Sequence, residues 1–302
     1  MPFKSQLHTD ALLSNVSVKY RNTDFIALSI FPEVPVKKDT DRYRIYAPDF
    51  RLPQTLKANK GIAREHYFET SYSSYALEDH ALKDYVTDDD QDNFDEGDLR
   101  ADTVEELSDV ILRRLELSVA SLFTTTNWSL RTSLSAAQAW NLDTVGSNPI
   151  PVVDTGASVV LQNSGLLPNF LAVGRDAFVG VKNHQSILDR YKYTQPAVIT
   201  PALLSNVFGV QEFLVSNAQL DSSNRGATAT VAQMWDNSAF LGYKPARPGP
   251  KAPSCGYIFR KNVPMVRRWM DNERNAEAIE VRIKYQAKIV ASLSGYLIKD
   301  VV

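Results

Sequence analysis

The sequence predicts an α+β fold with extended segments attached, on three observations. Apolar and polar side chains alternate between Arg42 and Tyr85 and again over the last 30 residues, as they do in β-strands. Between these segments, residues 102–126 repeat apolar side chains at three- and four-residue intervals, which indicates one long helix. Residues 149–269 then mix short helical and extended patterns.

The first 85 residues predict two extended segments. Residues 1–41 are polar and interrupted by prolines, which indicates an N-terminal arm with a short helix or turn near Asp10–Val18. Residues 42–85 predict a long hairpin whose strands start near Arg42 and Glu65, with turn-forming and basic residues between them. An isolated hairpin is marginally stable in water. These residues alone leave two placements open, on the hairpin's own domain or across another subunit.

A segment rich in aspartate follows the hairpin. Its residues Asp88, Asp90 and Asp92 match the first three ligand positions of a calcium-binding EF-hand loop. The match then fails, because Asn93 stands where a sharp turn requires glycine and Leu99 where a bidentate glutamate belongs. We interpret the segment as a solvated acidic loop leading into a helix, whose dipole favours acidic groups near its N-terminus.

The helix predicted over residues 102–126 is the clearest element. Asp102 and Glu105 resemble a capping box at its start, and Asp109 and Arg113 form an i,i+4 ion pair on its polar face. Its apolar face comprises Val104, Leu107, Ile111, Leu115, Val119 and Leu122.

A second unit begins at the prolines near residue 149, and the C-terminal segment 270–302 alternates like paired strands. Thr200 and Pro201 suit the N-cap and first position of a helix that ends before Gly209. The predicted elements are helices at 152–162, 175–182 and 200–208, and buried strands at 170–173 and 213–215.

Composition limits the classes of protein that fit. Of the 302 residues, 44% are hydrophobic and 23% charged, and no apolar run approaches the roughly 20 residues that span a bilayer, so no membrane contact is expected. The single cysteine, Cys255, excludes a disulfide framework and suits a cytoplasmic protein. The net charge of -2 predicts only weak, non-specific contact with nucleic acid.

No catalytic, cofactor-binding or metal-binding residue is predicted. The four histidines are scattered without a metal-ligand spacing, and the sequence contains no nucleophile elbow, P-loop or dinucleotide-binding glycine motif. Cys255 has no histidine within sixty residues, which favours a quiescent thiol.

The order of these segments, together with four local motifs, resembles the major capsid proteins of tailed bacteriophages. The motifs are VITPALLSNVFGV at 198–210, MWDNSAFLGY at 234–243, SCGYIF at 254–259 and ASLSGYLI at 291–298. The resemblance implies a shell protein that forms hexamers and pentamers of an icosahedral capsid around double-stranded DNA, located in the virion and, during assembly, in the host cytoplasm. It also implies an N-terminal arm (1–41), an extended loop (42–85), a peripheral domain (86–148) containing the long helix, an axial domain (149–269), and C-terminal strands (270–302) that complete both domains.

In such a shell the extended loop reaches over a neighbouring subunit. We therefore expect contacts between subunits at Arg51, Lys57, Lys60, Arg64, Tyr67, Tyr72, Arg267 and Arg268. Some members of the family link subunits covalently through a lysine, an asparagine and a glutamate. Lys57 and Lys60 could supply the amine, but the other two residues have no match, so both lysines are interpreted as solvated.

The resemblance also implies partners and leaves alternatives. No long coiled-coil segment precedes the N-terminal arm, so a separate scaffolding protein is expected, together with a portal protein and a decoration protein as a further candidate. An encapsulin-type compartment shares the fold and is the first alternative. A soluble enzyme or binding module of mixed fold is the second, and it would require a convergent polar pocket.

Overall fold

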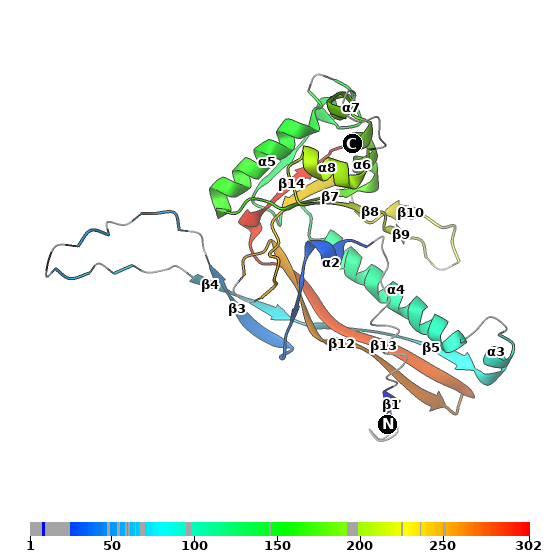
Figure 1. The fold of residues 1–302 in the computed structure, drawn as a ribbon. Coiled ribbons are helices and arrows are strands. Elements are labelled where there is room, and N and C mark those ends of the chain that lie inside the picture. Colours follow the sequence, from blue (N-terminus) through cyan, green and yellow to red (C-terminus); the bar gives the residue numbers. More distant parts are fainter. Residues whose placement is uncertain are drawn as a thin grey trace.

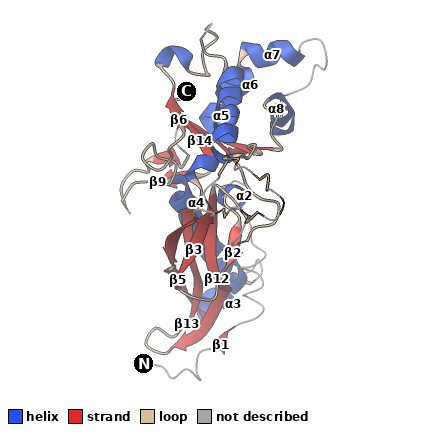
Figure 2. Cartoon of the chain, turned by 90° about the vertical axis from the view of Figure 1, so that its left-hand side faces the viewer, coloured by secondary structure: helices blue, strands red, loops and turns tan. Residues whose placement is uncertain are grey.

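The fold is described by a computed structural model over residues 8–9, 25–46, 49–52, 55–57, 59, 61–63, 65–66, 70–94, 98–144, 146–191, 199–224, 226–235, 237–249 and 252–302. Within this part of the chain, two units each combine a five-stranded sheet with helices, and a hairpin projects from between them (Figure 1). Figure 2 shows the unit rich in helices above the long strands of the other unit. The predicted α+β class is confirmed.

The first unit is built on a long, mainly antiparallel sheet. β12 (Gly256–Asp271) pairs with β13 (Ala276–Ile289), and β5 (Glu78–Thr87) lies on the other side of β13. Along β13, Val281 and Ile283 are buried while the charged residues that alternate with them are partly exposed. The alternation predicted for this strand is confirmed, because a helix covers one face of the sheet.

That helix is α4 (Leu99–Ala120), which lies along β13 and β5. Its buried residues include Val104, Ile111, Leu115 and Val119, as the three- and four-residue spacing predicts. Buried residues of the second unit, among them Phe170 and Phe240, belong to the same hydrophobic core as this face of α4.

The ends of α4 differ from the predicted span of 102–126. Asp98, rather than Asp102, is the N-cap, and its carboxylate accepts a hydrogen bond from the Arg100 N–H. The helix ends at Ala120, and Phe123 and Trp128 in the turn that follows are buried in the main core. The side chains of Asn127 and Trp128 donate hydrogen bonds to the carbonyl of Leu122 and so satisfy backbone that the helix leaves unpaired.

Two strands of the long sheet lie outside the segments in which the sequence analysis placed them. Residues 78–85 were expected in the extended loop, but they form most of β5. Residues 256–269 were expected in the axial domain, but they form most of β12. In addition, residues 88–92 of the expected acidic loop form a short helix, α3 (Asp88–Asp92). The pairing of β5 with β13 joins distant parts of the chain, which local patterns do not reveal.

The second unit is a sheet with the strand order β6, β14, β11, β7, β8. β7 (Phe170–Gly174) and β11 (Ser238–Gly242) pair in its centre, and every residue of both strands is buried. β14 (Gly295–Lys299) pairs with β11, and β8 (Glu212–Ser216) pairs with β7. The C-terminal residues thus contribute β13 to the first sheet and β14 to the second.

Helices pack around this second sheet. α5 (Pro149–Ser164) starts at Asn148, whose side chain accepts a hydrogen bond from the Ile150 N–H, and it ends at Gly165, which has a φ of 71°. The helices and strands predicted between residues 152 and 215 are confirmed, with ends that differ by at most three residues. The other helices of this unit are α6 (Arg175–Asn183), α7 (Gln185–Tyr191) and α8 (Pro201–Val207).

Aromatic rings fill the junction between the units. The ring centroid of Phe240 lies 4.6 Å from that of Phe123 and 4.5 Å from that of Trp128. At Gly295, the first residue of β14, a β-carbon would overlap the rings of Phe240 and Trp128. The shorter elements of the fold are β1 (His8–Thr9), α2 (Ala27–Ile30), β2 (Glu33–Pro35), β6 (Arg131–Ser133), β9 (Gln219–Asp221), β10 (Val231–Gln233), and the 3₁₀ turns η2 (Ala136–Gln138) and η3 (Ser292–Ser294).

Candidate assembly interface

A hairpin projects from the body of the molecule (Figure 1). It consists of β3 (Thr40–Tyr46) and β4 (Thr70–Ala76), which pair in antiparallel fashion over seven residues. We call residues 40–76 the arm. The predicted hairpin is confirmed, although its second strand starts at Thr70 rather than near Glu65.

The outer part of the arm carries large apolar side chains that remain in water. The exposed fraction is 93% for Leu52, 82% for Leu56 and 97% for Ile62. We call these three residues the arm tip. Burying one aliphatic side chain of this size stabilises a structure by about 1.5–3 kcal/mol, and the arm tip gains almost none of this within its own chain. Exposed apolar groups on a projecting segment are typical of an interaction surface.

The arm also contacts the second unit through the aromatic ring of Phe50. A β-carbon placed on Gly165 would lie 2.9 Å from the ring of Phe50, so the ring rests against the end of α5. Gly165 also adopts a left-handed backbone conformation with a φ of 71°. Glycine is required here on both counts, because it supplies the turn after α5 and the space for Phe50.

Aromatic packing also fixes the root of the arm to the long sheet. The ring of Phe259 on β12 stacks on Tyr75 with a centroid distance of 4.7 Å and contacts Tyr43 at 5.2 Å. With Val34 and Tyr257, these rings form a small hydrophobic cluster separate from the two large cores. The root is therefore anchored while the tip is not.

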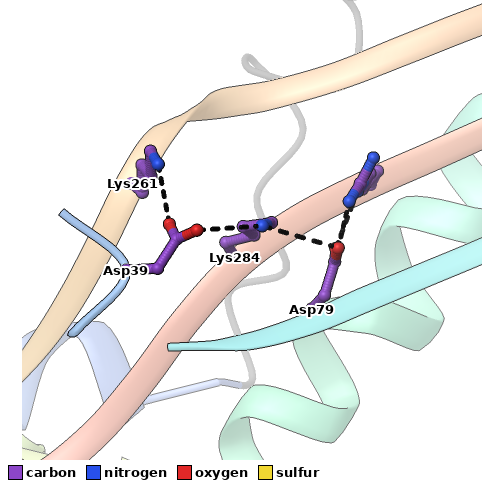
Figure 3. A network of polar contacts seen from close by, with 5 residues as sticks. Asp39, Asp79, Lys261 and Lys284 are labelled. Atoms are coloured by element: carbon purple, nitrogen blue, oxygen red, sulfur yellow. Dashed lines mark hydrogen bonds and ion pairs between the residues drawn. The ribbon is translucent and has the colours of Figure 1, made fainter. Parts of the chain in front are cut away.

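A network of charged groups lies beside this cluster (Figure 3). Asp39 Oδ1 accepts a hydrogen bond from Lys261 Nζ at 2.7 Å, and its Oδ2 lies 3.5 Å from Lys284 Nζ. Asp79 pairs with Arg282 and lies 3.8 Å from the same lysine. The network connects the residue just before β3 with β5, β12 and β13, so it helps to fix the direction in which the arm leaves the sheet.

These contacts shift the titration of both carboxyl groups. The hydrogen bond from Lys261 holds the pKa of Asp39 below its ordinary value. The hydrogen bond from Arg282 likewise lowers the pKa of Asp79. Both groups are therefore favoured in the charged form that the network needs.

The structure separates the candidate contact residues predicted from the sequence. Arg51 and Lys57 are exposed on the arm, and Tyr72 is exposed on β4. The guanidinium of Arg44 donates a hydrogen bond to the Tyr72 hydroxyl at 3.0 Å. The remaining arm candidates, Lys60, Arg64 and Tyr67, lie outside the described residues.

Arg267 and Arg268 lie on β12, away from the arm. There the short strand β1 pairs with them, and Arg268 Nε lies 3.1 Å from a carboxylate oxygen of Glu277. Glu277 also binds Arg100 at 2.7 Å. This pair of arginines therefore takes part in contacts within the chain, which the sequence alone did not indicate.

Sequence reasoning emphasised the basic residues of the arm and missed its apolar tip. The available signal was the placement of Leu52, Leu56 and Ile62 among proline and polar residues, where no partner strand is in reach to bury them. Basic side chains are well hydrated when exposed, whereas aliphatic side chains lower the free energy when a partner removes them from water.

A buried carboxylate connects the N-terminal segment to the body. Glu116 on α4 is fully buried, and its two oxygens accept hydrogen bonds from the backbone N–H groups of Ile26 and Ala27 at 3.2 and 2.7 Å. The indole N–H of Trp235 donates to the same carboxylate at 2.5 Å. Burial raises the pKa of Glu116, and these hydrogen bonds act in the opposite direction.

Two further residues with reactive side chains, Cys255 and His184, are buried. Burial raises the pKa of the Cys255 thiol to about 12. His184 is buried, with Ser147 Oγ 3.0 Å from its Nε2 and Ser186 Oγ 2.7 Å from its Nδ1. Among the described residues, no three acidic, histidine or cysteine side chains converge on a possible metal site. No described helix has both the length and the apolar character to cross a bilayer.

Comparison with known proteins identifies relatives of this chain. No protein-family model matches it. It is 26% identical over 303 residues to the major capsid protein of Burkholderia phage BcepMu, a match that covers 97% of this chain and 96% of the relative. It is also 26% identical over 244 residues to the major capsid protein of Pseudomonas phage JBD67, covering 78% and 77% of the two chains. The chain is thus similar over nearly its whole length to one phage major capsid protein and over most of its length to another.

Solved structures show the fold of this chain. A phage-related protein from Bordetella bronchiseptica RB50 matches with a TM-score of 0.80 and 22% identity, over 98% of both chains. The capsid of cyanophage P-SCSP1u matches with a TM-score of 0.59 and 9% identity, over 89% of this chain and 85% of that one. The chain therefore has the fold of phage capsid proteins, and the resemblance found in the sequence is confirmed.

Proposed function

We propose that copies of this capsid protein assemble into hexamers and pentamers that close an icosahedral shell around the double-stranded DNA of a tailed phage. The observation that carries the proposal is the arm, whose tip exposes Leu52, Leu56 and Ile62 almost completely. Such a segment gains stability only when another molecule covers it. The two curated relatives support the same role, because both are phage capsid proteins.

We assign roles in the shell to the two units. The long sheet with α4 is proposed as the peripheral domain, and the second sheet with α5 to α8 as the axial domain around the capsomer axis. The arm is the extended loop that reaches over a neighbour, with Arg51, Lys57 and Tyr72 as described candidate contacts. Lys60, Arg64 and Tyr67 remain candidates on the same segment. Arg267 and Arg268 remain candidates as well, in addition to their contacts within the chain, where both pair with β1 and Arg268 binds Glu277.

The proposed partners follow from this role. The net charge of -2 is compatible with a container that holds DNA through weak, non-specific contact. A separate scaffolding protein, a portal protein and a decoration protein remain proposed partners, and assembly would take place in the host cytoplasm.

A structural role, rather than a catalytic one, fits the side chains of this chain. The Cys255 thiol is buried and its pKa is raised to about 12, so little thiolate forms at neutral pH. His184 is enclosed between two serines. An encapsulin-type compartment would share the fold, but the curated relatives come from phages and favour a virion shell.

Negative-stain electron microscopy of the expressed, purified protein tests the proposal. A folded monomer of this length has a radius of gyration of about 19 Å, so closed shells and free subunits differ plainly in size. We expect rings and closed shells, and nuclease-protected DNA in particles recovered from a phage infection. Subunits that stay monomeric with every co-expressed phage protein would overturn the proposal, and shells filled with a protein cargo instead of DNA would favour the compartment.

A further inference from the structure

An apolar pocket of about 180 Å³ opens at the root of the arm. Its lining is mainly apolar and includes Val34 on β2, Tyr43 on β3, Phe259 on β12, and Val290 and Ala291 after β13, together with the charged Arg44 on β3. A cavity of about 150 Å³ lined by apolar side chains accommodates benzene, so this pocket has room for one leucine or isoleucine side chain.

The arm tip of the same molecule does not reach this pocket. β3 leads outward from it, and Figure 1 shows the arm extending away from the body. Ile45 on β3 also lines the pocket, whereas the side chains of Leu56 and Ile62 are 82% and 97% exposed in the same molecule. An arm-tip side chain that fills the pocket would therefore come from a different molecule.

We propose that the pocket at the root of the arm receives the arm tip of a second copy of this chain, with Leu56 or Ile62 as the inserted side chain. The proposal rests on the proposed function, because it requires copies to lie side by side. Two observations carry it: the pocket is apolar and of the size of one aliphatic side chain, and the tip exposes aliphatic side chains at 82% and 97%. Insertion would remove both from water.

This contact joins two different surfaces, the tip of one copy and the root of the next. A heterologous contact of this kind leaves a free tip and a free pocket at the two ends of a chain of subunits, and it generates a ring when the rotation closes. Because the pocket lies at the root of the arm, occupation of one copy's pocket would also stiffen the arm with which that copy engages the next.

Disulfide trapping tests the pairing directly. The full-length double variant L56C/A291C is assembled and then oxidised with copper phenanthroline, and a second double variant carries I62C with A291C. A disulfide requires Cα atoms about 4.4–6.8 Å apart. We expect a ladder of covalent oligomers on a non-reducing gel that ends at the size of the capsomer, whereas either single variant should give dimers at most.

The matched control replaces the pocket cysteine by L161C on α5, which is an exposed leucine outside the pocket. The native Cys255 is left in place because it is buried. A ladder of equal intensity from L56C/L161C, or shells in which neither tip variant gives any species above the dimer, would overturn the proposal.

A second measurement avoids the possibility that a pocket variant fails to fold. The A291C variant is purified as a folded subunit and then modified with a bulky maleimide, so that the pocket is filled after folding. We expect the yield of shells to fall at least tenfold, while the same modification of L161C leaves it unchanged. Normal shell yield from the modified A291C subunit would contradict insertion at this pocket. Absence of shells from the unmodified wild-type protein would instead count against the proposed function.

Discussion

The arm and the second sheet of this capsid protein obtain their stability in different ways. In the centre of the second sheet, every residue of β7 and β11 is buried within the chain. In the arm, β3 and β4 form a two-stranded sheet with no further strand among the described residues, and the tip exposes three aliphatic side chains by 82% to 97%. The sheet buries its central strands within one molecule, whereas under the proposed function the arm buries its tip only against a neighbour.

The contrast assigns the two regions separate tasks. A body that folds by itself can present a fixed geometry, and an arm with unfilled apolar surface can supply the free energy of association. The charged network of Asp39, Asp79, Lys261 and Lys284 lies between the two and holds the root of the arm in place. Substitutions in the arm should therefore change assembly, and substitutions in the body should change the free energy of unfolding.

The largest expected effect is the loss of assembly when the arm tip becomes polar. The triple variant L52S/L56S/I62S should form no closed shells, because it removes the apolar side chains that a neighbour would bury. Its melting temperature as a monomer should stay within about 2 °C of the wild type, since exposed substitutions change stability little. Deleting residues 53–64 should have the same outcome. Electron microscopy and differential scanning calorimetry measure the two properties.

The control for this variant changes exposed leucines on the body instead. L161S/L167S on and after α5 should assemble normally. Normal shells from the triple arm variant would remove the arm from the assembly mechanism.

The second prediction compares truncation of a buried leucine in the body with the same truncation at the arm tip. Leu241 on β11 is fully buried, so L241A should lower the free energy of unfolding by about 2–5 kcal/mol through lost burial and a residual cavity. The same truncation at the arm tip, L56A, should change it by less than about 0.5 kcal/mol. Urea denaturation of monomeric subunits compares the two, and equal effects would mean that the arm tip is buried within its own chain.

The third prediction concerns the buried carboxylate that holds the N-terminal segment. E116Q retains one acceptor oxygen but cannot accept all three hydrogen bonds, so it should lower the free energy of unfolding by about 1–3 kcal/mol at pH 7. Because burial raises the pKa of Glu116, the folded state binds its proton more tightly than the unfolded state does. The stabilisation from that proton is complete below the ordinary pKa and is lost as the pH rises through the raised value.

The pH dependence separates this effect from simple loss of packing. The free energy of unfolding of the wild type, minus that of E116Q, should increase as the pH is lowered from the raised pKa towards the ordinary pKa. A difference that does not vary with pH would show that the carboxyl group titrates equally in the folded and unfolded states.

The smallest effect is expected at the charged network. Asp79 is partly exposed, so D79N should lower the free energy of unfolding by less than about 1 kcal/mol, and high salt should reduce this difference. Because the pKa of Asp79 is lowered in the folded state, the ion pair stabilises the protein at neutral pH. This stabilisation is lost as the pH falls through the folded-state pKa of Asp79. Urea denaturation at low and high ionic strength checks this, and a large effect independent of salt would contradict the assignment of a screened ion pair.

Local signals in the sequence were sufficient to predict most of the helices and strands between residues 152 and 215, but not the strand pairing of the long sheet. Asn148 and Gly165 mark the ends of α5, and Thr200 and Pro201 mark the start of α8, because capping depends on residues within one turn. Residues 78–85 were predicted in the extended loop, whereas they form most of β5, whose partner β13 lies near the other end of the chain. Pairing at that separation depends on tertiary packing, which local propensity does not encode.

The candidate site was predicted only in part for the same reason. Alternation in residues 42–47 and 65–75 predicted the hairpin, whose second strand starts later, at Thr70. Its function depends, however, on which side chains remain uncovered, and this is a property of the whole fold. Glu116 shows the same limit, because a glutamate on an amphipathic helix gives no local sign that the backbone of Ile26 and Ala27 will bind it.

The rate at which one cysteine at the arm tip reacts with a maleimide tests the central claim most directly. The L56C variant is labelled as dissociated subunits and again as closed shells, with L161C on α5 as the reference site. If a neighbour covers the arm tip, the rate at Leu56→Cys should fall at least a hundredfold on assembly relative to the reference. Equal rates in subunits and shells would show that the arm tip stays in water, and would contradict the account.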